Sequence, residues 1–123
     1  MTFYKDLQIG NVKIEGNIIL APMSGVTDMP FRRLVKKWGA SLVVSEMIAS
    51  HAMVLQTKAS LQKAKASMDE QPASVQLAGC DPTIMAEAAK LNQDLGAAII
   101  DINMGCPVKK VVNGFAGSAL MKD

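Results

Sequence analysis

The chain has few of the residues that build metal centres or disulfide frameworks. Its 123 residues include one histidine, His51, and two cysteines, Cys80 and Cys106, which do not form a C-x-x-C pair. Without a cluster of cysteine and histidine, we expect neither a zinc site nor any other metal site. So little cysteine is typical of a reducing compartment, and we predict a cytoplasmic location.

Long hydrophobic runs and a strong charge imbalance are also missing. The longest apolar runs are far shorter than the roughly 20 residues that span a bilayer, so we expect no membrane association. Met1–Asp6 lacks an apolar segment after a basic start, and we predict no secretory signal. A formal net charge of +2 does not by itself indicate a nucleic-acid partner.

What the chain does contain is a repeated unit of a short apolar strand, a polar or glycine-containing loop and an amphipathic helix. Successive strand ends lie roughly 25 to 30 residues apart, which is the length of a βα unit with parallel strands. Four such strands are predicted, at Asn17–Ala21, Leu42–Glu46, Ser74–Leu77 and Ala98–Asn103. The segment Leu7–Ile14 is predicted to form a hairpin that turns at Gly10-Asn11.

Two helices have clear ends. In each, an aspartate caps the start, a proline lies in the first turn and a glycine ends the helix. These residues are Asp28, Pro30 and Gly39 in one helix, and Asp81, Pro82 and Gly96 in the other. A less regular helix is predicted between them, within Met47–Lys65.

The spacing of apolar residues predicts which helix faces are buried. The first helix has one apolar face, made of Phe31, Leu34, Val35 and Trp38. Its polar face consists of Arg32, Arg33, Lys36 and Lys37. The later helix has a buried stripe made of Ile84, Ala88, Leu91 and Leu95.

Four parallel βα units in series fit two architectures, a doubly wound open sheet and a (β/α)8 barrel. The first strand-to-helix turn, Ala21–Asp28, has neither the G-x-G-x-x-G pattern nor the P-loop pattern, which disfavours a nucleotide-binding open sheet. A whole barrel has about 250 residues. We therefore predict that residues 1–123 are a partial α/β domain, the N-terminal half (about four βα units) of a TIM barrel.

Polar side chains lie at the ends of two strands, where parallel α/β proteins bind their ligands. Gln76 and Asn103 each carry an amide that donates and accepts hydrogen bonds, which suits a planar heterocycle with imide-like edges. Asp101 and Asn103 lie two residues apart, so both point to the same side of their strand. For Gln76, Asp101 or Glu46 alone, a structural role is an equal alternative, but together they indicate a binding site.

Cys106 lies in the loop Asn103–Pro107 after the last strand. Gly105 permits a tight or left-handed turn and Pro107 fixes the following φ, so the thiol is held in a defined place. There it can act as a nucleophile, a metal ligand or a proton donor. Cys80 is expected to be an inert, buried thiol.

Four segments in register resemble the tRNA-dihydrouridine synthase family, most closely its bacterial B-type branch. They are Ala21–Arg32, Ser45–Met47, Val75–Gly79 and Asp101–Val111. The resemblance covers nearly the whole chain and implies an FMN-dependent (β/α)8 barrel followed by a helical tRNA-binding domain. The implied reaction is reduction of the C5–C6 bond of specific uridines in tRNA, with NADPH as the reductant of the flavin.

The resemblance also implies roles for individual residues. FMN contacts are implied for Pro22, Met23, Ser24 and Gln76. Asn103 would orient the target uracil, and Lys110, with Lys109, would help to place the RNA. Cys106 would be the general acid that protonates C5 while the flavin hydride goes to C6. An ordinary cysteine thiol is mostly protonated near neutral pH, as a proton donor must be.

The family's later strands supply a lysine, a histidine and the loops that hold the FMN phosphate, and none of these lies within the 123 residues. We therefore expect the chain to be a fragment that is not catalytically competent alone. Open edges at its first and fourth strands predict self-association. Two alternatives remain: another FMN barrel of the dihydroorotate or dihydropyrimidine dehydrogenase type, and a non-catalytic half-barrel.

Overall fold

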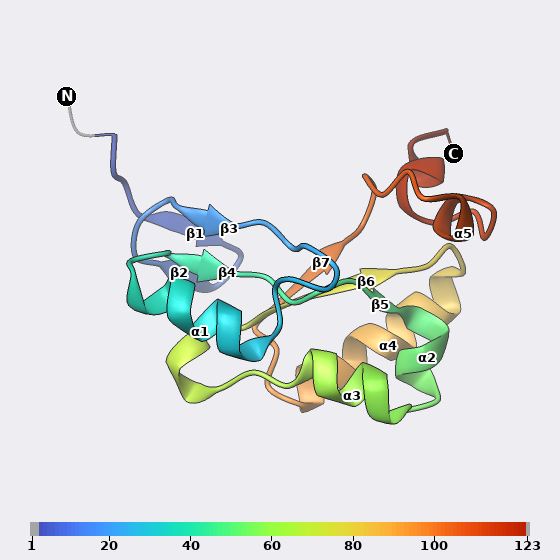
Figure 1. The fold of residues 1–123 in the computed structure, drawn as a ribbon, viewed down its shortest axis with the longest axis horizontal. Helices are drawn as coiled ribbons and strands as arrows, with labels where there is room; N and C mark the ends of the chain where they lie inside the picture. Colours follow the sequence, from blue (N-terminus) through green and yellow to red (C-terminus); the bar gives the residue numbers. More distant parts are fainter. Residues whose placement is uncertain (1–2, 123) are drawn as a thin grey trace.

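Parallel strands form the centre of the computed structural model, which describes residues 3–122 (Figure 1). Strand β3 pairs in parallel with β4, and β5, β6 and β7 form a second parallel group in that order. A parallel bridge between Val44 and Ser74 joins the two groups into one layer. The strands are β3 (Ile19–Leu20), β4 (Leu42–Val43), β5 (Ile48–Ala49), β6 (Ser74–Ala78) and β7 (Ile99–Ile102).

The four predicted strands are confirmed, with one change. The strand predicted at Leu42–Glu46 is the shorter strand β4, and a separate strand that was not predicted, β5, follows after residues 44–47. The predicted hairpin is also confirmed: β1 (Leu7–Ile9) and β2 (Val12–Ile14) are antiparallel. Gly10 turns between them with a φ of +56°, a conformation that glycine adopts without steric cost.

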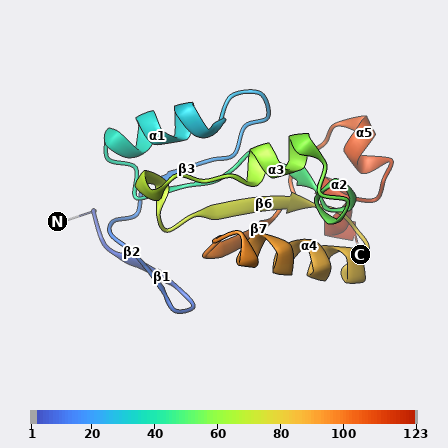
Figure 2. The same ribbon diagram turned by 90° about the horizontal axis from the view of Figure 1, so that it is seen from below.

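Helices α1 to α4 lie on one side of the strands in Figure 1, and the view from below shows α1, α3 and α4 side by side across them (Figure 2). The irregular middle helix is two short helices. The α-helices are α1 (Met29–Lys37), α2 (Ser50–Val54), α3 (Lys58–Ala64), α4 (Pro82–Asp94) and α5 (Lys109–Val112). Two 3-10 helices are η1 (Met68–Glu70) and η2 (Gly117–Lys122). Within residues 3–122, no helix combines the length and the apolar character needed to cross a membrane.

The predicted helix caps are confirmed. The Asp28 carboxylate accepts a hydrogen bond from the Phe31 amide at 3.0 Å. The Asp81 carboxylate accepts from the amides of Thr83 and Ile84 at 2.8 and 3.0 Å. Each carboxylate satisfies amides that have no partner within the first helical turn, and this fixes where the helix begins.

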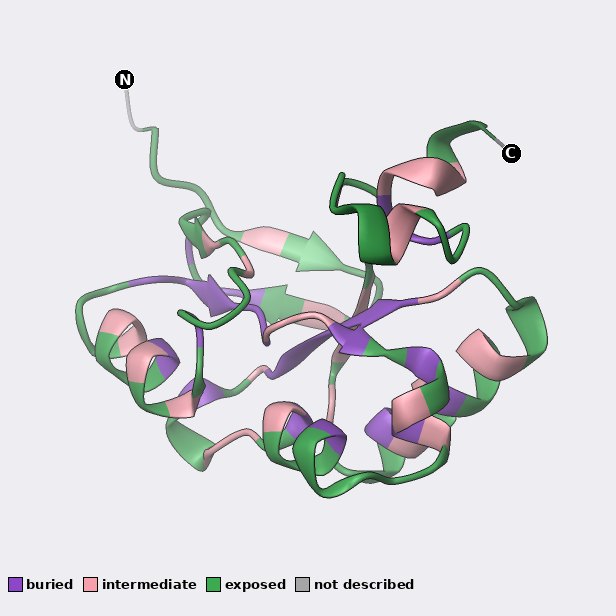
Figure 3. Cartoon of the chain, turned by 45° about the vertical axis from the view of Figure 1, so that its right-hand side comes forward, coloured by how far each residue is buried: buried purple, intermediate pink, exposed green. Residues whose placement is uncertain are grey.

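The main core lies between the strands and the helices, where Figure 3 shows the buried positions. Val75 and Leu77 of β6 are buried against residues of the helices, including Met53 and Ala88. Because side chains alternate along a strand, Ser74 and Gln76 point to the opposite side of the layer. The polar side chains of β6 are therefore directed away from the helices.

The predicted orientation of α1 is wrong. Trp38 is 83% exposed and Leu34 is 53% exposed, whereas Arg32, which was assigned to the polar face, is 3% exposed. The reason is a buried ion pair, in which the guanidinium of Arg32 donates to the Glu70 carboxylate at 2.5 Å. Arg32 also donates to the carbonyl oxygens of Thr27 and Lys65, each at 2.9 Å, so its charge is fully compensated.

Two further burial predictions are wrong. Leu95 is 60% exposed because it lies beyond the last residue of α4, where the predicted stripe has turned away from the core. Cys80 is exposed, because it lies in the loop that leads from β6 to the cap of α4.

Candidate active site at the carboxyl ends of the strands

A cavity of about 590 Å3 lies at the carboxyl ends of the parallel strands. Five of the eight residues predicted to bind or react line it: Pro22, Ser24, Gln76, Asn103 and Cys106. They come from the β3–α1 loop, from β6 and from the loop after β7. The parallel arrangement brings these three segments together, because parallel strands end at the same edge of the layer.

A chain of hydrogen bonds connects the polar side chains of the cavity. The Gln76 amide donates to the Asp101 carboxylate at 2.5 Å and accepts from the Asn103 amide at 3.0 Å. The Asn103 oxygen then accepts from the backbone amide of Cys106 at 3.0 Å and from that of Gly105 at 3.3 Å. Asp101 and Asn103 thus point to the same side of β7, as predicted, and the Asn103 side chain bonds the backbone of Cys106.

The loop between β3 and α1 is held by two residues that the sequence did not single out for this purpose. Thr27 is fully buried, and its hydroxyl accepts from the Met23 amide at 3.0 Å and donates to the Met23 carbonyl at 3.2 Å. The Glu46 carboxylate accepts from the Gly25 amide at 2.6 Å. Glu46 therefore has the structural role that was one of its two expected roles.

The Cys106 loop is closed by a segment further along the chain. The Ser118 amide donates to the Cys106 carbonyl at 3.0 Å. Gly117 is buried with a φ of +62°, and a Cβ there would lie 2.6 Å from the Cys106 carbonyl oxygen. Gly105, in contrast, does not adopt a left-handed conformation, and a Cβ there would meet nothing within 4 Å. The glycine that this loop needs is thus Gly117.

Three of the predicted site residues lie outside the cavity. Met23 is 41% exposed and is not part of its lining. Lys109 and Lys110 lie on α5, where both side chains are exposed. The single histidine, His51, is on α2 and does not line the cavity either, so the described residues offer no imidazole to activate the Cys106 thiol.

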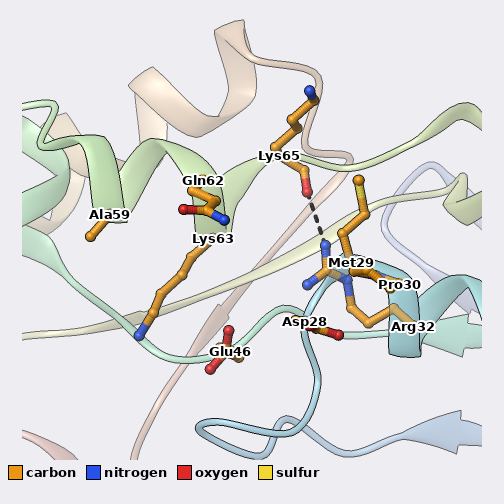
Figure 4. Close-up of a pocket in the computed structure, with 9 residues that line it drawn as sticks. All are labelled: Asp28, Met29, Pro30, Arg32, Glu46, Ala59, Gln62, Lys63 and Lys65. Carbon is orange, nitrogen blue, oxygen red and sulfur yellow. Dashed lines mark hydrogen bonds between the residues drawn. The ribbon is translucent and has the colours of Figure 1, made fainter.

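A second hollow, of about 460 Å3, lies between α1 and α3 (Figure 4). Its most buried charge is Arg32, which Figure 4 shows bound to the carbonyl oxygen of Lys65. That guanidinium is compensated by Glu70 and by two carbonyl oxygens, so it is not available to a ligand. The chemistry-bearing side chains are therefore those at the carboxyl ends of the strands.

The arrangement provides amide donors and a thiol. Among residues 3–122, no group of three or more histidine, cysteine, aspartate or glutamate side chains is placed to hold a metal ion. Two amides from neighbouring strands suit recognition of a planar heterocycle, and a thiol on the adjoining loop suits proton transfer.

Comparison with known proteins identifies the family. The family model described as dihydrouridine synthase matches residues 19–123. The chain is 64% identical over 118 residues to a probable tRNA-dihydrouridine synthase of Rickettsia bellii, covering 95% of this chain and 36% of that protein. It is 54% identical over 117 residues to tRNA-dihydrouridine synthase B of Xanthomonas axonopodis pv. citri, covering 95% of this chain and 35% of that protein.

The corresponding enzyme of Pseudomonas aeruginosa, also named tRNA-dihydrouridine synthase B, is 50% identical over 117 residues. The chain thus spans about a third of the length of the curated relatives that it matches, since the covered share is 35 to 36%. Because the family model matches most of the sequence, including every segment that forms the cavity, this chain belongs to the dihydrouridine synthase family.

Proposed function

We propose that this chain contributes part of the active site for the reduction of uridine to 5,6-dihydrouridine in tRNA, with NADPH as the reductant. The observation that supports this most directly is the single cavity in which Pro22, Ser24, Gln76, Asn103 and Cys106 meet. Family membership supports the same reaction, because relatives that share this segment are named tRNA-dihydrouridine synthases.

The residues of the cavity fit an FMN cofactor. The Gln76 amide has one N–H bound to Asp101, which leaves its second N–H for a heterocycle edge. Pro22 and Ser24 would line the other side of the bound ring, and Met23 would contribute through its side chain, because its backbone is used by Thr27. When bound, FMN would supply the hydride that reduces C6 of the uracil.

Asn103 and Cys106 would act on the uracil. The target base has to leave its stack to enter a cavity of this kind, so the enzyme binds an extruded nucleotide. The second N–H of the Asn103 amide would hydrogen-bond a uracil carbonyl. The Cys106 thiol would donate its proton to C5, as a general acid rather than as a nucleophile, since no described histidine adjoins it.

The RNA itself would be held outside the cavity. Lys110 is exposed on α5, close in sequence to Cys106, where an ammonium group can reach a phosphate oxygen of the bound tRNA. A modification enzyme with a tRNA substrate acts where tRNA is found, so we place the reaction in the cytoplasm.

The fold fits the first half of a (β/α)8 barrel. Its strands β3 to β7 are all parallel, and helices α1 to α4 lie on one face of the layer (Figure 1). In a barrel the face of the strands opposite these helices becomes the packed interior, and the carboxyl ends carry the active site. Coverage of about a third of the relatives' length is consistent with a partial barrel.

A chimeric enzyme tests the function. Residues 1–123 of this chain would be joined to the remaining part of the Rickettsia bellii relative, and dihydrouridine would be measured by mass spectrometry in tRNA that lacks it beforehand. We expect dihydrouridine to form with NADPH. The intact relative is the positive control, and the relative's C-terminal part alone is the negative control.

Two outcomes would contradict the proposal. A chimera that reduces free pyrimidines but leaves tRNA uridines unchanged would indicate a flavin barrel of the dihydroorotate or dihydropyrimidine dehydrogenase type. A folded chimera that binds no flavin would indicate a non-catalytic half-barrel.

A further inference from the structure

We infer that Asp101 is a positioning residue, whose carboxylate sets the direction of the amides of Gln76 and Asn103 and thereby holds the backbone of Cys106. The inference deepens the proposed function, and only the identity of the ligand rests on that function. The hydrogen-bond chain itself is a property of the folded molecule.

Both ends of this chain of hydrogen bonds have only one possible polarity. At one end an ionised carboxylate can only accept, so the Gln76 amide must turn its nitrogen toward Asp101. At the other end the backbone amides of Gly105 and Cys106 can only donate, so Asn103 must turn its oxygen toward them. The two orientations agree, because the remaining bond joins the Asn103 nitrogen to the Gln76 oxygen at 3.0 Å.

Strand pairing explains why these side chains meet. Gln76 of β6 lies directly opposite Asp101 of β7 in the parallel register. Asn103 follows Asp101 on the same side of β7, and its backbone continues the pairing by donating to Leu77 at 2.9 Å. Gln76 is only 6% exposed, so its amide depends on protein partners rather than on bulk water.

The donor-to-acceptor direction of these hydrogen bonds determines which groups the cavity offers to a ligand. The Gln76 and Asn103 amides each use one N–H within the hydrogen-bond chain. The second N–H of each has no partner within the described part of the protein. Both amides therefore offer donors to the cavity that they line. Donors select carbonyl oxygens and unprotonated ring nitrogens. The two free N–H groups therefore favour a planar dione over a heterocycle with an amino group at the same position.

The hydrogen bond to Asp101 is the strongest of the series, because hydrogen bonds to an ionised acceptor are stronger than those between neutral groups. Without the carboxylate, the Gln76 nitrogen loses its partner and the amide is free to rotate. Rotation would remove the acceptor of Asn103, and Asn103 would then hold the Cys106 amide less firmly. We expect the effect to reach the backbone of Cys106 although Asp101 does not touch it.

Amide hydrogen exchange of the 123-residue chain tests this, with variants Asp101→Leu and Asp101→Asn. Asp101→Leu keeps a similar shape without an acceptor, and we expect exchange of the Cys106 amide to speed up by about fivefold or more, the loss expected for one hydrogen bond. Asp101→Asn keeps a neutral acceptor and should give an intermediate rate. The matched control is Asp94→Leu, at an exposed position on α4, which should leave this rate unchanged.

The amides of Val75 and Leu77, in the core strand, report global stability in the same spectra. A faster rate at Cys106 with unchanged rates at these two amides supports a positioning role. Equal acceleration at all three, or no change at Cys106 in either variant, would overturn it. Flavin binding by the chimera is a separate measurement, and its failure would count against the proposed function while leaving the exchange result in place.

Discussion

At the scale of single residues, the Cys106 loop depends on a glycine that lies well beyond it in the chain. Gly117 is buried with a φ of +62°, and its α-carbon faces the carbonyl oxygen of Cys106. A side chain there would strain the backbone and push against the loop that carries the thiol. This contact joins η2 to the candidate active site.

We therefore expect Gly117→Ala to displace the Cys106 loop. A Cβ at 2.6 Å from a backbone oxygen cannot be accommodated without movement, and the positive φ adds strain. The measurement is the reaction rate of the Cys106 thiol with a disulfide reagent, in a Cys80→Ala background so that one thiol is counted. Gly105→Ala is the control, because a Cβ at that position meets nothing within 4 Å. Equal effects of the two substitutions would contradict this account.

At the scale of elements, two ion pairs join helix α1 to η1. Arg32 is buried with Glu70, which ties α1 to η1. The neighbouring pair of Arg33 and Asp69 joins the same two elements at 2.8 Å but is exposed. The two pairs offer a direct comparison of a buried and an exposed ion pair between the same elements.

We expect Arg32→Met to lower the free energy of unfolding by about 3–5 kcal/mol, because it leaves the Glu70 carboxylate buried without its partner. Arg33→Met removes a solvent-exposed pair and should cost at most about 1 kcal/mol. Urea denaturation followed by circular dichroism gives both values. A loss at Arg32 no larger than that at Arg33 would show that the buried pair does not anchor the helix.

The C-terminal end of α1 also predicts a pH dependence. Burial lowers the pKa of Lys36 below its ordinary value of 10.5, and the nearby Glu15 carboxylate opposes part of this effect. The unfolded chain then binds more protons than the folded chain just below pH 10.5, so the contribution of Lys36 to stability rises with pH. We expect the free energy of unfolding of the native chain, relative to Lys36→Gln, to increase as the pH rises toward 10.5. A constant or falling difference would contradict the lowered pKa.

The sequence could predict those features that depend on contacts between residues close together in the chain. The caps at Asp28 and Asp81 bind amides two or three residues away, so they can be read from neighbouring residues. The orientation of α1 could not, because its cause is Glu70, which lies 38 residues beyond Arg32. A buried arginine on an otherwise amphipathic helix leaves no signal in the apolar spacing.

The residues of the candidate site also fall into those that the sequence could predict and those that it could not. Gln76, Asn103 and Cys106 could be predicted because the carboxyl ends of parallel strands meet at one edge. The contributions of Thr27 and Gly117 could not, since each depends on a contact with a loop whose path is set by the whole fold. Gly105 was the more conspicuous glycine, but its backbone has no unusual conformation.

At the scale of the whole molecule, the strand layer has two edges. Within residues 3–122, β3 pairs only with β4, and β7 pairs only with β6. Ile19 on β3 is 44% exposed and Ile102 on β7 is 53% exposed. Unpaired edges with apolar side chains favour pairing with another chain.

We therefore expect the 123-residue chain to self-associate, by pairing of its β3 and β7 edges with those of a second copy. Light scattering after size-exclusion chromatography should show a dimer or larger species whose share grows with concentration. Lysine at both edges, in an Ile19→Lys, Ile102→Lys variant, should shift the chain toward monomer. Leu55→Lys, at an exposed position after α2, is the control and should not. A chain that stays monomeric at all concentrations would show that these strand edges do not pair with a second copy.

The proposed role of Cys106 is to donate a proton during the reduction of uridine in tRNA. The most direct measurement compares the two half-reactions of the chimeric enzyme carrying Cys106→Ala, with Cys80→Ala as the matched control. We expect Cys106→Ala to oxidise NADPH still through its flavin but to form almost no dihydrouridine in tRNA, while Cys80→Ala does both. Loss of both half-reactions in Cys106→Ala, or normal formation of dihydrouridine, would contradict it.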